Sequence, residues 1–239
     1  RSFDRTMPEE INRILTDAIS ETLFTTCRDA DENLRKEGVP ENRIHFAGNI
    51  MIDSLEYILP HLDKSDILRR LEIRSENYLC VTLHRPSNVD DPARLTEILR
   101  ALDDFAAEIK IVFPAHPRTS RVIEKIDWKP ANPDLLIIEP LGYIDFMKLV
   151  TTARAVITDS GGIQEETTYL GIPCLTVRPN TERPVTVSEG TNSLVEPSRA
   201  ALTEAVGKTL ADEKPERPVI KFWDGKTSER ILETLTRLY

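Results

Sequence analysis

The stretch from residue 155 to residue 177 narrows the possible folds more than any other part of the chain. An apolar run, Ala155–Thr158, ends in Asp-Ser-Gly-Gly and passes directly into a helical pattern that stops at Gly171. A second apolar run, Cys174–Val177, follows after Ile-Pro. Short apolar runs separated by one helix are typical of neighbouring strands in a parallel sheet. The stretch therefore predicts a strand, a glycine turn, a helix and a second strand.

The glycine turn has the chemistry of an anion site. Ser160 is placed to cap the helix, and Gly161 and Gly162 let another group approach the backbone closely. The N–H groups at a helix start carry partial positive charge, so a diphosphate fits there. Glu165 and Glu166, one turn further on, can accept hydrogen bonds from ribose or sugar hydroxyls. The same turn also occurs purely as a helix cap, where such glutamates only complement the helix dipole.

The loop after the second strand favours the binding interpretation. Residues 179–184 read Pro-Asn-Thr-Glu-Arg-Pro, which puts Arg183 shortly after an expected strand. In open parallel sheets, ligands bind at the carboxyl ends of the strands, where Ser160 and Arg183 would both lie. The two loops together indicate a site for a nucleotide diphosphate.

Composition excludes several other classes of protein. The chain has 239 residues with 40% hydrophobic and 30% charged residues, so it can bury a core and stay in solution. Its net charge of −9 argues against a nucleic acid or an anionic membrane as partner. Cys27, Cys80 and Cys174 lie too far apart for a zinc knuckle, so we expect reduced core residues and no metal. We find no membrane-length apolar run and no signal peptide, and we expect a cytoplasmic protein.

From Tyr78 onward, apolar runs alternate with amphipathic helical patterns, as in a Rossmann-like parallel sheet covered on both faces. The expected strands are Tyr78–Leu83, Ile109–Phe113, Leu135–Ile138, Ala155–Thr158, Cys174–Val177 and Ser193–Val195. The expected helices between them are Pro92–Ala107, capped by Asp90 or Asp91, then Arg118–Ile126, Asp145–Thr152 and Gly162–Leu170. The fold class is therefore α/β.

The two ends of the chain have a different pattern. Residues 1–55 show two strand–helix units with too few strands for a sheet of their own. Their expected helices and strands are Glu9–Ser20, Leu23–Thr26, Asp29–Glu37, a strand-like run at 43–48 and a helix from Ile50 to Leu59. Two further helices, Arg199–Leu210 and Ser228–Leu238, are expected after the sheet.

Six motifs in order resemble the non-hydrolysing UDP-N-acetylglucosamine 2-epimerases along the whole chain. They are Pro8-Glu-Glu-Ile-Asn-Arg13, Gly48-Asn, His84-Arg85, Pro114-Ala-His116-Pro, Asp159-Ser-Gly-Gly-Ile-Gln-Glu-Glu166 and Thr181-Glu-Arg-Pro184. The resemblance implies two Rossmann-like domains that face each other across a cleft, the architecture called glycosyltransferase-B-like.

The resemblance also implies that this chain is the C-terminal two-thirds of such a protein, with an incomplete N-terminal domain. Residues 1–55 would be the remnant of that domain, and residues 56–77 a connecting helical segment. Residues 78–222 would form the UDP-binding domain, and 223–239 a helix that packs back on the N-terminal domain.

Members of the family interconvert UDP-GlcNAc and UDP-ManNAc. A base removes the proton at sugar carbon 2, UDP departs, and UDP then re-adds with reprotonation on the other face. The resemblance implies a UDP-sugar substrate, no cofactor, a homodimer for the complete protein and a place in cell-surface polysaccharide biosynthesis. It leaves open which UDP-sugar is used, since a UDP-diacetamido-glucuronate epimerase would look similar.

Site residues follow from the resemblance position by position. Ser160, Gly161 and Gly162 match the turn that holds the diphosphate, Glu166 the ribose ligand, Arg183 the arginine near sugar and phosphates, and Phe146 the aromatic beside uracil. His84 and Glu9 match catalytic residues, and Arg85 and His116 match a neighbouring activator site. Two further carboxylates of the family would precede Arg1, so we expect this chain to bind UDP weakly and to be inactive by itself.

Each residue also has an ordinary structural explanation. Glu182 and Arg183 could form a solvated ion pair, Phe146 could be a core residue, and His84 and His116 could anchor loops. Two other functions remain as alternatives. A UDP-sugar-dependent glycosyltransferase would use the same turn but needs an acceptor, and the His84-Arg85 motif argues against it. The other alternative is a non-catalytic UDP-binding protein.

Overall fold

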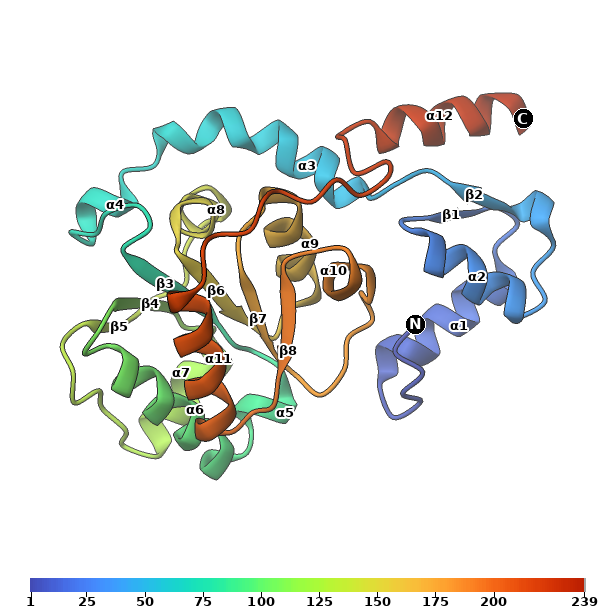
Figure 1. Cartoon of the computed structure of the whole chain (residues 1–239). Helices are drawn as coiled ribbons and strands as arrows, with labels where there is room; N and C mark the ends of the chain where they lie inside the picture. The colour runs from blue at the N-terminus through green and yellow to red at the C-terminus, as the bar shows by residue number, and fades with distance from the viewer. Residues whose placement is uncertain (239) are drawn as a thin grey trace.

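A computed structural model describes residues 1–238, and its larger part is built on a six-stranded parallel sheet. The strand order is β5-β4-β3-β6-β7-β8, with every neighbouring pair parallel (Figure 1). The strands are β3 (Tyr78–Thr82), β4 (Lys110–Pro114), β5 (Leu135–Ile138), β6 (Ala155–Thr158), β7 (Cys174–Val177) and β8 (Asn192–Val195). All six predicted strands are confirmed to within one residue at each end, and so is the α/β fold class.

Helices cover both faces of this sheet. Its helices are α5 (Pro86–Val89), α6 (Pro92–Phe105), α7 (Pro117–Lys125), α8 (Tyr143–Thr152), α9 (Gly161–Leu170), α10 (Val185–Ser188) and α11 (Arg199–Ala211). Asp91 caps α6 by accepting the N–H groups of Ala93 and Arg94. The five longer helices are confirmed to within two residues. The sequence did not predict α5 and α10, because four residues are too few to show a helical period.

Alternate residues of each strand enter opposite cores, as the pleat requires. Ile111 and Phe113 of β4 pack in one core with α6 and α11, whereas Val112 packs in the other with α8 and the helix that precedes β3. The three cysteines are free and buried, as expected. These two cores hold the carboxyl ends of the strands in fixed positions, and the loops of the site begin there.

The smaller part of the molecule precedes β3 in the sequence. Its elements are α1 (Pro8–Ile19), β1 (Leu23–Thr25), α2 (Arg28–Lys36), the 3-10 turn η1 (Glu41–Arg43) and β2 (Ile44–Phe46). Helix α3 (Ile50–Ile58), the 3-10 turn η2 (Leu59–Lys64) and α4 (Ile67–Arg70) follow and pack against α8 and α9 of the larger part (Figure 1). The expectation that residues 1–55 have too few strands for a sheet was wrong, because β1 and β2 pair in parallel. Leu23, Leu34 and Ile44 form a small separate core beside them.

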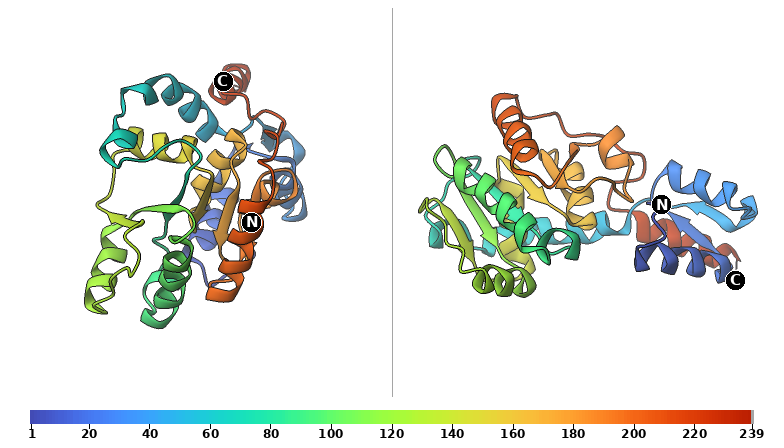
Figure 2. Two further views of the ribbon diagram at one scale, coloured as in Figure 1. Left: turned by 60° about the vertical axis from the view of Figure 1, so that its left-hand side comes forward. Right: turned by 90° about the horizontal axis from the view of Figure 1, so that it is seen from below.

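The chain crosses between the two parts twice at one place, once near Gly48 and once near Phe222. The final helix, α12 (Thr227–Leu238), contacts α3 and lies beside the smaller part in Figure 2. The segment before it returns against the outgoing one at Gly48, whose φ is +102°. A Cβ on Gly48 would lie 2.1 Å from the carbonyl oxygen of Phe222, so only glycine fits there. The proposed domain limits, including the C-terminal helix as part of the N-terminal domain, stay predictions.

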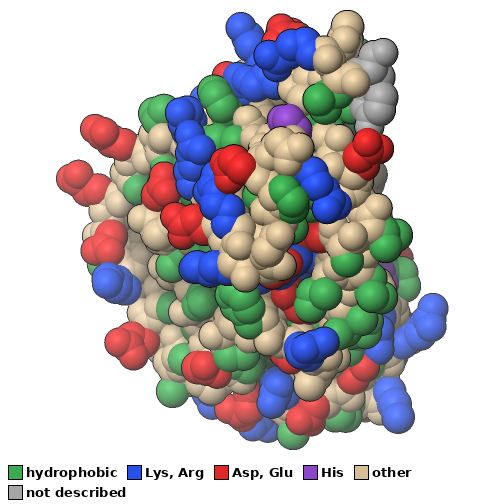
Figure 3. All heavy atoms as spheres, turned by 90° about the vertical axis from the view of Figure 1, so that its right-hand side faces the viewer, with side chains coloured by type: hydrophobic (Ala, Val, Ile, Leu, Met, Phe, Trp, Pro, Cys, Tyr) green, Lys and Arg blue, Asp and Glu red, His purple; other side chains and the backbone are tan. Residues whose placement is uncertain are grey.

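Within residues 1–238, no helix is both long enough and apolar enough to cross a membrane. Figure 3 shows the face formed by the smaller part, where basic and acidic side chains are interspersed.

Candidate functional site

The loops that follow β3, β4, β6 and β7 meet at one edge of the sheet. They carry His84-Arg85, His116, Asp159-Ser160 and Arg178–Pro184 respectively. Helix α1 of the smaller part faces this edge, where the Nη1 atom of Arg85 lies 3.4 Å from an Oε1 atom of Glu9. The residues that the sequence suggested for a site therefore lie at the carboxyl ends of the strands, where they were expected.

Asp159 holds the loop that follows β3, although it lies at the end of β6 itself. It is fully buried at the end of β6, and its carboxylate accepts the backbone N–H groups of His84 (3.1 Å) and Arg85 (2.9 Å). The side-chain amide of Asn88 (3.1 Å) and Nδ1 of His84 (3.1 Å) also contact it. Burial by itself raises the pKa of Asp159, but His84 and the backbone donors outweigh it and lower that pKa. Asp159 therefore stays ionised and holds the His84-Arg85 loop in place.

The glycine turn leaves room for a ligand. Ser160 occupies the N-cap position of α9, but its side chain makes no capping hydrogen bond, so that part of the expectation was wrong. Its backbone N–H instead donates to the hydroxyl of Thr158, at 3.0 Å. A Cβ built on Gly162 meets no atom within 4 Å, whereas one on Gly161 would lie 2.9 Å from Oε1 of Glu182. The helix start is thus open at Gly162 and close to an acidic side chain at Gly161.

Arg183 pairs with Glu165 and not with its neighbour in sequence. The Nε atom of Arg183 lies 2.9 Å from Oε1 of Glu165, whose side chain is 4% exposed. Burial raises the pKa of Glu165 in spite of the adjacent guanidinium. The alternative of a solvated pair between Glu182 and Arg183 was wrong. Glu165 is engaged by Arg183, so Glu166 is the better placed of the two glutamates to receive hydroxyls.

Glu182 is the centre of a separate arginine cluster. Its carboxylate lies 2.8 Å from Arg178, 3.3 Å from Arg85 and 3.9 Å from Arg13 of α1. Burial alone raises the pKa of Glu182, but the Arg178 guanidinium and the other nearby positive charge outweigh it and lower the pKa to about 2. Glu182 therefore links its own loop to the loop after β3 and to helix α1, which are far apart in the sequence.

Glu166 has an aromatic partner that the sequence analysis did not identify. The hydroxyl of Tyr143 donates to Oε1 of Glu166 at 2.7 Å. Tyr143 begins α8, and Phe146 follows three residues later, a spacing that puts both on one face of the helix. Phe146 is half-buried against the core. The i, i+3 spacing of two aromatics was the signal in the sequence that could have found Tyr143.

His116 lies near His84 and caps α7. Its Nδ1 atom accepts the backbone N–H of Arg118 at 3.2 Å, and the two imidazole ring centroids are 6.1 Å apart. Together with the contact between Arg85 and Glu9, this brings the four residues expected at the catalytic and activator sites into one cluster.

A buried polar network supports the loop that carries Arg183. Gln164 accepts the hydroxyl hydrogen of Thr181 (2.6 Å) and a side-chain N–H of Asn192 (3.1 Å). Thr181 in turn accepts the backbone N–H of Arg183 at 3.0 Å. Because these side chains come from α9, the loop and β8, the network fixes Arg183 relative to the glycine turn.

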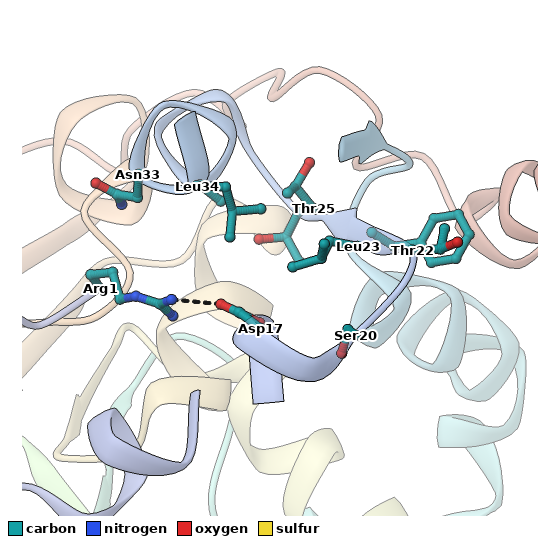
Figure 4. Close-up of a pocket in the computed structure, with 11 residues that line it drawn as sticks. Arg1, Asp17, Ser20, Thr22, Leu23, Thr25, Asn33 and Leu34 are labelled. Atoms are coloured by element: carbon teal, nitrogen blue, oxygen red, sulfur yellow. Dashed lines mark hydrogen bonds and ion pairs between the residues drawn. The ribbon is translucent and has the colours of Figure 1, made fainter. Parts of the chain in front are cut away.

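Of two cavities in the structure, one borders the site and the other does not. One of about 480 Å³ borders the site and is lined by Glu9, Arg85 and Arg178 among others. Another of about 270 Å³ lies away from the strand edge, between α1, β1 and α2 (Figure 4). Arg1 reaches into it and pairs with Asp17 at 2.6 Å. Among residues 1–238, no group of three or more histidine, cysteine or acidic side chains is arranged to hold a metal ion.

The sequence and the fold both have close counterparts among known proteins. The family model described as UDP-N-acetylglucosamine 2-epimerase matches residues 1–236. The UDP-N-acetylglucosamine 2-epimerase of Methanocaldococcus jannaschii is 40% identical over 99% of this chain and 66% of its own length. The UDP-2,3-diacetamido-2,3-dideoxy-D-glucuronate 2-epimerase of Pseudomonas aeruginosa is 37% identical over 100% of this chain and 66% of its own length.

The crystal structure of the Methanocaldococcus jannaschii protein in complex with UDP-GlcNAc and UDP superimposes with a TM-score of 0.89. That match has 40% identity and covers 99% of this chain and 67% of the other. This chain spans about two thirds of the length of the relatives it matches.

Proposed function

The chain belongs to the UDP-N-acetylglucosamine 2-epimerase family, and we propose that the protein interconverts UDP-GlcNAc and UDP-ManNAc by elimination and re-addition of UDP. The observation that carries this proposal is the convergence of the glycine turn, Glu166 and Arg183 at one strand edge. Parallel sheets bind nucleotides at that edge. The Methanocaldococcus jannaschii relative, whose structure contains UDP-GlcNAc and UDP, supports the ligand class.

Each part of UDP has a chemically matched group in the proposed complex. The diphosphate lies on the amides at Gly161 and Gly162, next to the open hydroxyl of Ser160. Glu166 accepts the ribose hydroxyls, and Phe146 lies beside the uracil ring. Arg183 stabilises the charge that develops on the departing diphosphate.

The reacting sugar then faces the cluster formed by the loop after β3 and helix α1. We assign the catalytic roles to His84 and Glu9, whose types suit the transfer of a proton at carbon 2. Arg85 and His116 are assigned to a neighbouring activator site. Arg85 contacts Glu9, so a ligand on Arg85 would also act on the catalytic carboxylate.

The identity of the sugar is a second point to decide. The Pseudomonas aeruginosa relative acts, by its name, on a diacetamido glucuronate sugar, and it covers the whole of this chain at 37% identity. UDP-GlcNAc remains our first choice because the relative from Methanocaldococcus jannaschii is named for it at 40% identity. We also propose that the whole protein is a cytoplasmic homodimer that serves polysaccharide biosynthesis.

UDP binding is tested on the 239-residue chain itself. Titration with UDP followed by NMR is expected to shift the amides of Ser160, Gly161 and Gly162 most strongly. Shifts confined to the opposite ends of the strands, or no binding, would end the proposal. Turnover is tested on the product of the complete reading frame with UDP-GlcNAc and no acceptor. UDP-ManNAc is then expected, whereas a glycosyltransferase would leave the sugar unchanged.

Tyr143→Phe is expected to weaken discrimination between UDP and 2′-deoxy-UDP. Tyr143 fixes one oxygen of Glu166, so its loss frees the carboxylate and weakens its hydrogen bonds to ribose. We expect the ratio of the two Kd values to fall by about three- to tenfold, the range of one ordinary hydrogen bond. Calorimetry of both ligands measures it, and Tyr57→Phe on the exposed side of α3 is the matched control. An unchanged ratio would show that Tyr143 does not act through Glu166.

A further inference from the structure

Asp159 and His84 form a contact between a buried carboxylate and an imidazole ring. The two oxygens of Asp159 have different partners. Oδ1 lies 3.1 Å from Nδ1 of His84, whereas Oδ2 accepts Arg85 N (2.9 Å) and the side-chain amide of Asn88 (3.1 Å). The backbone N–H of His84 is shared between the two oxygens, at 3.1 Å from Oδ1 and 3.2 Å from Oδ2. Asp159 is fully buried, while the His84 side chain is 40% exposed. The carboxylate is thus fixed on its inner side and touches the ring with one oxygen.

This contact determines which nitrogen of the ring carries a hydrogen. An ionised carboxylate can only accept, and a neutral imidazole has one N–H and one bare nitrogen. The hydrogen of His84 must then be on Nδ1, where it can be donated to Asp159. The other nitrogen, Nε2, is left as a hydrogen-bond acceptor on the side of the ring away from Asp159.

We propose that Asp159 is a positioning residue for His84. It holds the neutral ring as the Nδ1–H tautomer, so that Nε2 is presented to the ligand in the cleft as an acceptor of a hydrogen bond or a proton. The role of His84 toward the ligand rests on the proposed function, whereas the tautomer does not. Asn88 also donates to the carbonyl oxygen of Val177 at 2.9 Å, which anchors the arrangement to β7.

An amide in place of the carboxylate is expected to move the hydrogen of the His84 ring from Nδ1 to Nε2. In Asp159→Asn, the oxygen would stay on the Oδ2 side, where three donors, including the backbone N–H of His84, require an acceptor. The NH₂ group would then face Nδ1 of His84 and donate to it. His84 would have to carry its hydrogen on Nε2, and the cleft would face a donor where the wild type offers an acceptor. In serine proteases, the same exchange at the aspartate of the triad keeps the geometry and produces the wrong tautomer.

The tautomer is measured by two-bond ¹H–¹⁵N correlation on the chain labelled at histidine, at a pH where the rings are neutral. The chain has four histidines, and His84→Gln identifies the signals of His84 by their loss. We expect Nδ1–H in the wild type and Nε2–H in Asp159→Asn. Nε2–H in the wild type would overturn the proposal, and this result does not depend on whether Asp159→Asn folds. Nδ1–H in a folded Asp159→Asn would overturn it as well.

Asn88→Ala is the matched control. It removes one donor from Asp159 and loosens the loop, but it does not touch the contact with His84, so the Nδ1–H tautomer should remain. In the complete protein, Asp159→Asn is expected to lower kcat at least tenfold more than Asn88→Ala does. Equal losses would show that Asp159 is only a loop anchor and would overturn the proposal. A wild-type protein without epimerase activity that still shows Nδ1–H would end the proposed function and leave the tautomer assignment standing.

Discussion

Replacing Arg183 with alanine is expected to lower kcat for UDP-GlcNAc epimerisation by about 10²- to 10³-fold, the usual cost of losing one group that stabilises transition-state charge. The KM should change less, because the diphosphate gains charge only as UDP departs. The backbone of Arg183 is held by Thr181, so the loop itself should survive the change. Steady-state kinetics of the complete protein measure both constants.

Arg183→Ala also removes the ion-pair partner of Glu165, and a double variant separates this effect from the loss of catalysis. Arg183→Ala leaves Glu165 buried without its partner, and a buried carboxylate in that position becomes protonated or destabilises the fold. Arg183→Ala combined with Glu165→Gln removes that charge as well. We expect the double variant to regain stability and to keep the loss of rate. A double variant with the wild-type rate would show that Arg183 only neutralises Glu165.

Replacing Glu182 with glutamine is expected to destabilise the protein by about 3–5 kcal/mol at pH 7, the cost of breaking a buried ion pair. Glu182 is 6% exposed, and its loss leaves the equally buried Arg178 without its closest counter-charge. Urea denaturation measures the difference in free energy of unfolding. The pair Arg35–Glu41 on the surface provides the control, since Glu41→Gln should cost less than about 1 kcal/mol.

The same variant has a predictable dependence on pH. The pKa of Glu182 is lowered to about 2 from an ordinary value of 4.5. Its ionised form therefore contributes its full stabilisation above pH 4.5, and that contribution is lost as the pH falls from 4.5 to about 2. The difference between the wild type and Glu182→Gln should shrink over this window. A difference that stays constant down to pH 2 would mean that the charge of Glu182 is not what stabilises the fold.

The sequence predicted the parts of the structure that repeat a simple pattern. The bounds of β5, β6 and β7 agree with the apolar runs, because a strand buried on both faces has no polar position to interrupt it. The pairing of β1 with β2 was missed, because each has only three residues and the pair forms through contacts across 20 residues of chain.

The sequence predicted at which edge of the sheet the candidate residues lie, but not which side chains contact each other there. Ser160 and Arg183 were correctly placed at one edge, because the ends of parallel strands meet there. The alternative that paired Arg183 with Glu182 was wrong, since sequence neighbours in a loop need not face each other, and Glu165 reaches Arg183 from α9. The role of Asp159 depends on a loop about 75 residues earlier in the chain. Such a contact requires the assembled sheet and leaves no local signal.

The double passage of the chain at Gly48 joins the two parts covalently at one place. The outgoing and returning segments touch there, and Trp223 of the returning one donates to the carbonyl oxygen of Thr26, at 2.9 Å. Ion pairs of α1 join the two parts at a second place, from Glu9 to Arg85 and from Arg13 to Glu182. Because Glu9 and Arg13 lie on one helix, a rotation of the smaller part about the crossing at Gly48 would change both distances at once. Those two distances act as one gauge of how far the cleft is open.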